Sequence, residues 1–405
     1  MFARVYYGWW IVLSCFLMNF YVGGIVFFSF TAFFEPIHRE FGWSYTQISL
    51  ASSLRGLEMG IFAPVVGVLV DRLGSRKLLF SGTIITGLGL LTLSLTQSLA
   101  MFYVSSLLIA FGAGGCTSVV TMTAVAEWFQ KNIGLALGIM ASGFGAGGLI
   151  IPLIVAWIDR FGWRMTLILL GLGMWVIGIP LSLVVRSRSQ SSRQEGAPHE
   201  KDGGREKSVE VPLGEAIRSK PFLLLNLVET IRMMAVTAVV VHLMPYMTTL
   251  GFQRSTGGLV AAALPLASIL GRFGFGWWGD RREKRFVLAT AFFIMAGGLL
   301  VFSFAGNMAT VALFLLLFSP GFGGSMVVRG AILREYFGKA SFGKMLGIAL
   351  GAASVGGIVG PTLAGYVFDL LGDYVPVWQI LSLACLAAVG MTFGIKPLQS
   401  VERFS

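Results

Sequence analysis

Charged residues, cysteines and catalytic motifs are all scarce in this sequence of 405 residues. Only 12% of the residues are charged and 56% are hydrophobic, which is far more apolar side chain than a soluble core could bury. The three cysteines lie singly inside apolar runs, which argues against a disulfide framework or a metal site. Walker A, HExxH and GxSxG motifs are absent, so ATP-driven work and hydrolysis have no support in the sequence. We therefore expect a polytopic membrane protein that is not an enzyme and uses no cofactor.

Apolar runs divide the chain into regular units. Twelve of them are each long enough to cross about 30 Å of hydrocarbon as a helix. They cover residues 8–33, 46–69, 78–97, 101–125, 134–157, 164–185, 221–246, 256–279, 286–305, 309–333, 345–368 and 374–395. Residues 186–220 have no apolar periodicity and are rich in Ser, Gly, Lys, Arg and Glu. The pattern predicts an all-α membrane protein with twelve transmembrane helices in two six-helix halves, residues 1–185 and 221–405, joined by a solvated linker at 186–220.

Basic residues predict the orientation of these helices. The side that holds both termini and the linker collects 22 Lys and Arg residues, against four on the other side. By the positive-inside rule, both termini and the linker are cytoplasmic in a multi-pass protein of the plasma (inner) membrane. The formal charge of +11 has the same explanation, so we expect no nucleic-acid partner.

An internal repeat relates the two halves. GVLVDRLGSRK at 67–77 is echoed by GWWGDRREKR at 276–285, 209 residues later, and the same offset relates Pro152 to Pro361. Glycines let helices approach closely, and the charges that follow can form a network that holds one conformational state and breaks in the other. The alternative is a charged turn that only anchors orientation. The candidate gating residues are Asp71, Arg72, Arg76, Asp280 and Arg281.

These features together resemble the major facilitator superfamily along essentially the whole chain. Within it, YYGWWIV at 6–12, WFQKNIGLALGI at 128–139, FGWR at 161–164 and an arginine deep in the eighth run resemble the monocarboxylate porter group and its bacterial relatives, which include the oxalate:formate exchangers. The resemblance implies that Arg272 pairs with a substrate carboxylate. The sequence departs from the group at Ser268, where an acidic or amide residue is usual, and around Asn19 and Tyr21, where animal members carry a lysine.

GFGAGG at 143–148 matches the dinucleotide fingerprint literally, but it lies inside an apolar run with no strand before it. We interpret it as a site of close helix packing that ends at Pro152.

Six charged residues lie inside the predicted helices, where each costs on the order of 2.5–3.5 kcal/mol on insertion scales. Arg55 with Glu58 and Glu229 with Arg232 form i,i+3 pairs that can neutralise each other. Arg272 and Arg329 have no such local partner, although Arg329 lies close enough to the cytoplasmic end of its helix to snorkel there instead.

Two unpaired cations and two neutralised pairs predict a net positive site that attracts a small organic anion. The candidate substrate-binding residues are Arg272, Arg232, Ser268, Asn19, Tyr21 and Arg329, and the proton-coupling candidates are Glu229 and Glu58. If Glu229 neutralises Arg232, one free arginine remains near the midplane and a monocarboxylate of lactate or pyruvate type fits; if not, a dicarboxylate or an oxalate/formate-type exchange fits.

We expect alternating-access transport by a monomer in the lipid bilayer, with proton symport and anion exchange both open. A non-transporting membrane receptor or scaffold of the same fold is the alternative from another class.

Overall fold

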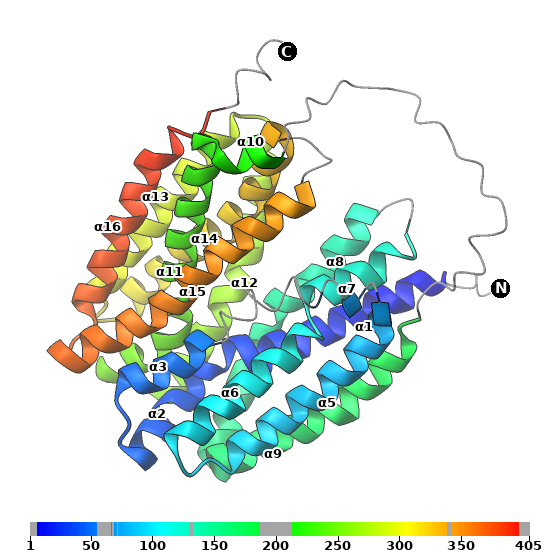
Figure 1. Cartoon of the computed structure of the whole chain (residues 1–405). Helices are drawn as coiled ribbons and strands as arrows, with labels where there is room; N and C mark the ends of the chain where they lie inside the picture. Colours follow the sequence, from blue (N-terminus) through cyan, green and yellow to red (C-terminus); the bar gives the residue numbers. More distant parts are fainter. Residues whose placement is uncertain are drawn as a thin grey trace.

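The computed structural model describes residues 6–54, 66, 69–70, 72–129, 133–186, 213–337 and 342–396. All regular secondary structure in these ranges is helical, which confirms the predicted class. Figure 1 shows the helices in two groups that lie side by side. We call α1 to α9 the N-terminal bundle and α11 to α16 the C-terminal bundle.

The N-terminal bundle begins with one apolar stretch of 35 residues, Tyr7–Phe41. Within this stretch, α1 (Tyr7–Val22) passes through a π-helical turn at Gly23–Phe28 into α2 (Phe30–Phe41). The bundle continues with α3 (Tyr45–Leu54), α5 (Ser75–Ser94), α6 (Leu99–Gly114), α7 (Ser118–Ala126), α8 (Ile133–Ala146), a 3-10 turn at Gly147–Ile150, and α9 (Ile151–Val184).

The C-terminal bundle is more regular. Its helices are α11 (Lys220–Thr249), α12 (Arg254–Gly279), α13 (Lys284–Ser303), α14 (Met308–Phe337), α15 (Phe342–Leu371) and α16 (Val375–Thr392). A short helix, α10 (Leu213–Arg218), precedes it inside the segment 186–220. The assignment of 186–220 as a linker between the halves stays a prediction.

Ten helices in the described ranges are long and apolar enough to cross a membrane. One of them, Leu135–Val184, contains two of the predicted spans, 134–157 and 164–185. Gly162 lies between those two spans with φ 80° and ψ 161°, a conformation that interrupts the helix there. The predicted span 46–69 falls partly outside the described residues, so the number twelve and the repeat stay predictions.

The connections at 42–44, 95–98, 250–253, 304–307 and 372–374 lie at one end of the helices, which we call the far end. The first turn of α1 and the last turn of α16 lie at the opposite, near end (Figure 1). Arg164 holds the far end of the N-terminal bundle together. Its guanidinium donates to Glu40 and to the carbonyl oxygens of Ser94 and Thr96, at 2.6–3.1 Å.

Polar contacts join the two bundles at the far end. Asp369 on α15 accepts hydrogen bonds from the backbone N–H groups of Tyr45 and Thr46, both at 2.8 Å, and from the Thr46 hydroxyl. Arg254 at the start of α12 pairs with Asp159 on α9 at 2.9 Å. Further along α3, Ser53 donates to the Ile358 carbonyl on α15 at 2.7 Å. The far end of the protein is therefore closed.

The GFGAGG segment packs closely, as predicted. A Cβ atom at Gly143 would lie 2.3 Å from the Phe16 carbonyl oxygen on α1, and one at Gly147 would lie 2.6 Å from the Gly24 nitrogen. A Cβ at Gly148 would lie 2.4 Å from the ring of Pro265 on α12. The glycines thus allow α8 to approach α1 and allow the two bundles to touch.

Candidate anion site

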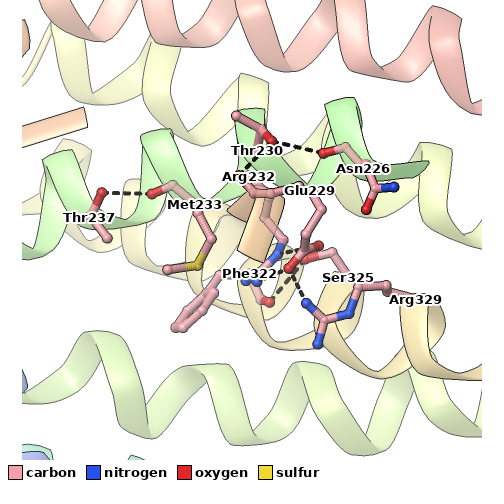
Figure 2. A network of polar contacts seen from close by, with 10 residues as sticks. Asn226, Glu229, Thr230, Arg232, Met233, Thr237, Phe322, Ser325 and Arg329 are labelled. Atoms are coloured by element: carbon pink, nitrogen blue, oxygen red, sulfur yellow. Dashed lines mark hydrogen bonds and ion pairs between the residues drawn. The ribbon is translucent and has the colours of Figure 1, made fainter. Parts of the chain in front are cut away.

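Two arginines share one carboxylate inside the C-terminal bundle (Figure 2). Arg232 donates from Nε to Glu229 Oε2 at 2.9 Å and from Nη2 to Oε1. Arg329 donates from Nη1 to the same Oε1. The Glu229, Arg232 and Arg329 side chains are all buried, with exposed fractions of 3%, 4% and 6%. We call these three residues the arginine–glutamate triad, and it carries one net positive charge.

Helix geometry explains how the triad forms. Glu229 and Arg232 stand three residues apart on α11, so they share one face of that helix. Arg329 reaches the same carboxylate from α14, so the pairing also joins two helices of the bundle. The predicted pairing of Glu229 with Arg232 is confirmed. The alternative that Arg329 snorkels to the membrane surface is wrong, because its guanidinium is buried against Glu229.

Phe322 and Ser325 on α14 line the same region (Figure 2). The Arg232 guanidinium lies over the Phe322 ring, 6.0 Å from its centroid. The Ser325 hydroxyl donates to its own helix at Phe322 O. Asn226 Oδ1 and Arg329 Nε are buried without a hydrogen-bond partner in the described structure. These unsatisfied polar atoms beside the triad are the groups that a polar ligand could complete.

Arg272 lies on α12, and it approaches the triad because α12 packs closely on α14. A Cβ at Gly271 would lie 2.0 Å from the Pro320 carbonyl oxygen, and one at Gly323 would lie 1.9 Å from the Ser268 carbonyl oxygen. The Arg272 side chain is within electrostatic reach of Arg232. Its Nε is buried without a partner in the described ranges, and no ion pair involves its guanidinium. Arg272 is thus a cation near the triad with unused hydrogen-bonding capacity.

The other predicted substrate-binding residues make internal hydrogen bonds. The Ser268 hydroxyl donates to Pro265 O at 2.6 Å on its own helix. Asn19 is buried and donates to Met140 O at 3.3 Å and toward Thr121 Oγ1 at 3.4 Å. The Tyr21 hydroxyl donates to Leu170 O at 3.0 Å on α9. Their predicted roles in binding stay predictions, and each would have to exchange an existing hydrogen bond for one to the substrate.

The predicted gating residues lie at the near end. Arg72, Arg76, Asp280 and Arg281 are exposed, and Asp71 lies outside the described residues. Arg281 stacks on Trp277, 4.0 Å from the ring centroid, and donates to its carbonyl oxygen at 3.1 Å. No ion pair between two described residues joins the bundles at this end. Glu58 and Arg55 also lie outside the described residues.

One buried titratable residue was missed by the sequence analysis. His242 on α11 has no exposed surface and contacts three other segments of the chain. Its ring nitrogens lie 2.8 Å from the Tyr374 hydroxyl, 2.9 Å from Ser49 Oγ and 2.9 Å from Pro361 O. Only Asp, Glu, Lys and Arg were considered inside the predicted spans. Histidine is also ionisable, and its position within the span 221–246 is the signal that identifies His242.

The chain belongs to the Major Facilitator Superfamily, whose family model matches residues 9–253 and 230–402. This superfamily consists of carriers and not of enzymes.

Within the superfamily, the chain resembles the monocarboxylate group. It is 25% identical over 394 residues to monocarboxylate transporter 13 of Bos taurus, covering 95% of this chain and 88% of that protein. It is 25% identical to monocarboxylate transporter 12 of Mus musculus, over 94% of this chain and 83% of the relative. Against human monocarboxylate transporter 2 the identity is 23%, over 89% of this chain and 78% of the relative.

Solved structures share the fold. A bacterial homologue of the human lysosomal transporter Spinster, in an inward-facing and unoccupied conformation, superimposes with a TM-score of 0.76 at 15% identity, covering 97% of this chain and 96% of that one. The inward-facing and occupied form of that homologue gives a TM-score of 0.72. The chain therefore shares the fold of these structures, and its membership of the superfamily makes it a multi-pass membrane transporter.

Proposed function

We propose that the protein is a secondary active transporter that carries a small organic anion, a monocarboxylate of lactate or pyruvate type, by alternating access. The observation that carries the proposal is a group of three arginines on α11, α12 and α14. Arg232 and Arg329 share the Glu229 carboxylate, and Arg272 lies within electrostatic reach of Arg232 without a carboxylate of its own in the described structure. Buried cations without full compensation are costly, so a site of this kind favours an anionic ligand. The similarity to monocarboxylate transporters 13 and 12 supports a monocarboxylate.

Arg272 is the proposed partner of the substrate carboxylate. Arg232 and Arg329 each form an ion pair with Glu229, whereas Arg272 forms no ion pair with another described residue. A guanidinium binds a carboxylate through two parallel hydrogen bonds, which gives both affinity and orientation. One guanidinium without a carboxylate partner suits one substrate carboxylate.

A dicarboxylate, or exchange of oxalate/formate type, is the second candidate. Glu229 compensates only one of the two arginines that it contacts, so the triad and Arg272 together carry two positive charges. A dianion would balance both charges, whereas a monocarboxylate balances one. Counterflow decides between them, because a labelled monocarboxylate should be displaced by unlabelled monocarboxylates and little affected by dicarboxylates.

Glu229 is the proposed proton-coupling residue among those described. If the substrate carboxylate displaces Glu229 from an arginine, the glutamate is left in an apolar site where it favours the protonated form. That exchange would make the protein a proton symporter, while direct exchange of one anion for another would need no proton. Glu58 remains a second candidate.

We also propose that the termini are cytoplasmic and that the protein is a monomer of the inner membrane. The far end, which is closed by contacts of Asp369 and Arg254, would then face outward and the protein would be inward-facing. In the opposite state, Asp71, Arg72, Arg76, Asp280 and Arg281 would close the near end.

The test is uptake of labelled lactate, pyruvate, oxalate and succinate into proteoliposomes, with and without an imposed pH gradient. Saturable uptake of a monocarboxylate supports the proposal. A receptor or scaffold would bind without saturable flux, and absence of flux for every anion tested would overturn transport.

A further inference from the structure

His242 lies at the boundary between the bundles, three residues before Pro245 on α11. Pro361 on α15 and Tyr374 before α16 contact its ring from the C-terminal bundle. Ser49 on α3 contacts it from the N-terminal bundle. The Phe34 ring on α2, also in the N-terminal bundle, packs against the imidazole with 5.2 Å between the ring centroids. The N-terminal bundle thus covers one side of the imidazole, and that cover depends on contact between the bundles at the far end.

The hydrogen-bond partners define the protonation state of this ring. The Pro361 carbonyl can only accept, so His242 Nε2 carries a hydrogen and donates it. The Ser49 hydroxyl donates its own hydrogen to Tyr45 O at 2.6 Å, so it also accepts from Nε2. Nδ1 is then free of hydrogen in the neutral ring and accepts from the Tyr374 hydroxyl. Burial raises the pKa of Tyr374 well above its usual value, so this hydroxyl keeps its hydrogen.

A second proton does not fit this arrangement. It would bind at Nδ1, and the Tyr374 hydroxyl would have to turn its hydrogen away from the ring, inside a site where Tyr374 itself has no exposed surface. The imidazolium would also be a buried charge, which is costly without a partner. The closed far end therefore holds the neutral form of His242.

Titratable groups lie at the far end on the segments that pack around the ring: Glu35, His38 and Arg39 on α2, Tyr45 on α3, Tyr246 on α11, Asp369 on α15, and Asp373 and Tyr374 in the last far-end connection. Arg39 pairs with Glu35 at 2.9 Å. The Asp369 charge acts directly on His242.

Asp369 links the ring to the closure of the far end. In the closed form its carboxylate is held by the N–H groups at the start of α3. When α3 moves away, Asp369 loses these donors and its negative charge becomes available to a nearby cation. The same movement removes Ser49 and admits water to His242.

We propose that His242 is a proton-binding site that couples pH at the far end to opening of that end. The inference rests on the alternating-access function proposed above. His242 is neutral when the far end is closed and takes up a proton when the bundles part, so acid stabilises the open form. The ligand is the proton itself, and the site is separate from the arginine–glutamate triad.

The test measures opening of the far end in the purified full-length protein without substrate. Spin labels at Gln97→Cys and Met308→Cys report on it, because both positions are exposed, lie at the far end and belong to different bundles. An exposed histidine titrates near pH 6.5, so lowering the pH from about 7.5 to about 5.5 should raise the ratio of open to closed protein roughly tenfold. In His242→Gln the ratio should not change with pH. The matched control His38→Gln, also on the far-end side, should respond as the unsubstituted protein does.

A second variant covers the case in which His242→Gln does not fold. Tyr374→Phe removes the hydroxyl that donates to His242 Nδ1 and so favours an Nδ1 without a hydrogen. The closed form of this variant should accept a second proton on His242 more readily, so the ratio of open to closed protein should change less on acidification. The proposal is overturned by a distance distribution that does not change with pH, by a full response in His242→Gln, or by a full response in Tyr374→Phe. Since no substrate is present, failure of anion transport would leave this measurement unaffected.

Discussion

Glu229 accepts hydrogen bonds from arginines on two different helices, so its replacement affects both at once. Spacing in the sequence predicts the pairing with Arg232, because i,i+3 neighbours share a helix face. It cannot predict the pairing with Arg329, which depends on how α14 packs against α11. The sequence therefore identifies the charged residues of the site, while the net charge that they carry together depends on which of them pair in the tertiary structure.

Glu229→Gln should lower the melting temperature of the purified protein in the absence of substrate. It leaves two neighbouring buried guanidinium groups without a carboxylate, a change of the kind that costs about 3–5 kcal/mol. An anion that fills the gap should stabilise the variant more than the unsubstituted protein, because binding to the folded state alone raises stability. Thermal unfolding with and without millimolar carboxylate measures both effects. Glu335→Gln, which removes a half-exposed partner of Lys284, is the control and should change little.

Arg272→Lys should reduce uptake of the transported anion by at least tenfold. Lysine keeps the charge but cannot make two parallel hydrogen bonds to one carboxylate. Initial rates of uptake into proteoliposomes measure the effect. Arg160→Lys is the control, because Arg160 is exposed and lies over the ring of its neighbour Phe161. Near-normal uptake by Arg272→Lys would remove Arg272 from the binding role.

At the scale of the helix, close backbone approach places Arg272 beside α14. Gly271 allows this approach, since a Cβ there would lie 2.0 Å from Pro320 O, while Gly274 on the same helix faces open space.

Gly271→Ala should therefore destabilise the protein by about 1–3 kcal/mol, as overpacking does, and should also impair uptake by moving Arg272. Gly274→Ala should be neutral or slightly stabilising, because alanine favours helix more than glycine does. The two variants form a matched pair, and the melting temperature and the uptake rate are measured for both. Equal behaviour would contradict the role assigned to the contact between α12 and α14.

Helical elements are well predicted from apolar runs, but their interruptions are not. The break at Gly162 lies between two spans that the sequence predicts as separate, whereas the apolar run 8–33 does not predict the π-helical turn at Gly23–Phe28.

The motifs that carry the family resemblance have structural roles. In FGWR, Trp163 and Arg164 bind Glu40, and in YYGWWIV, Tyr7 donates to Val184 O at 2.7 Å. Such contacts explain why a resemblance in these motifs indicates the fold more directly than the substrate.

For the whole molecule, closure of the far end depends on few polar contacts. Asp369 receives three hydrogen bonds from the start of α3, and Arg254 pairs with Asp159. Hydrogen bonds to charged groups contribute about 1.5–3 kcal/mol each, less where water competes.

Asp369→Ala should accordingly increase the ratio of open to closed far end by at least tenfold, equivalent to about 1.4 kcal/mol. The Gln97→Cys and Met308→Cys labels measure it at neutral pH. Asp373→Ala is the control, because Asp373 is exposed and its one hydrogen bond to another described residue is accepted from Val375 N within its own turn, at 3.0 Å. A similar shift in both variants would mean that acidic residues at this end act through their charge alone.

Glu229 has a further consequence for the return of the unloaded carrier. A binding site with bare buried cations would resist crossing between states when empty, and such a carrier would only swap one anion for another. Here two of the three guanidinium groups stay paired with the Glu229 carboxylate when no substrate is bound. On the proposed alternating-access mechanism, we expect this internal pairing to help the empty protein reorient, so that efflux into anion-free buffer runs at nearly the rate of exchange. In Glu229→Gln that balance should be lost, leaving a protein that exchanges anions but hardly releases them.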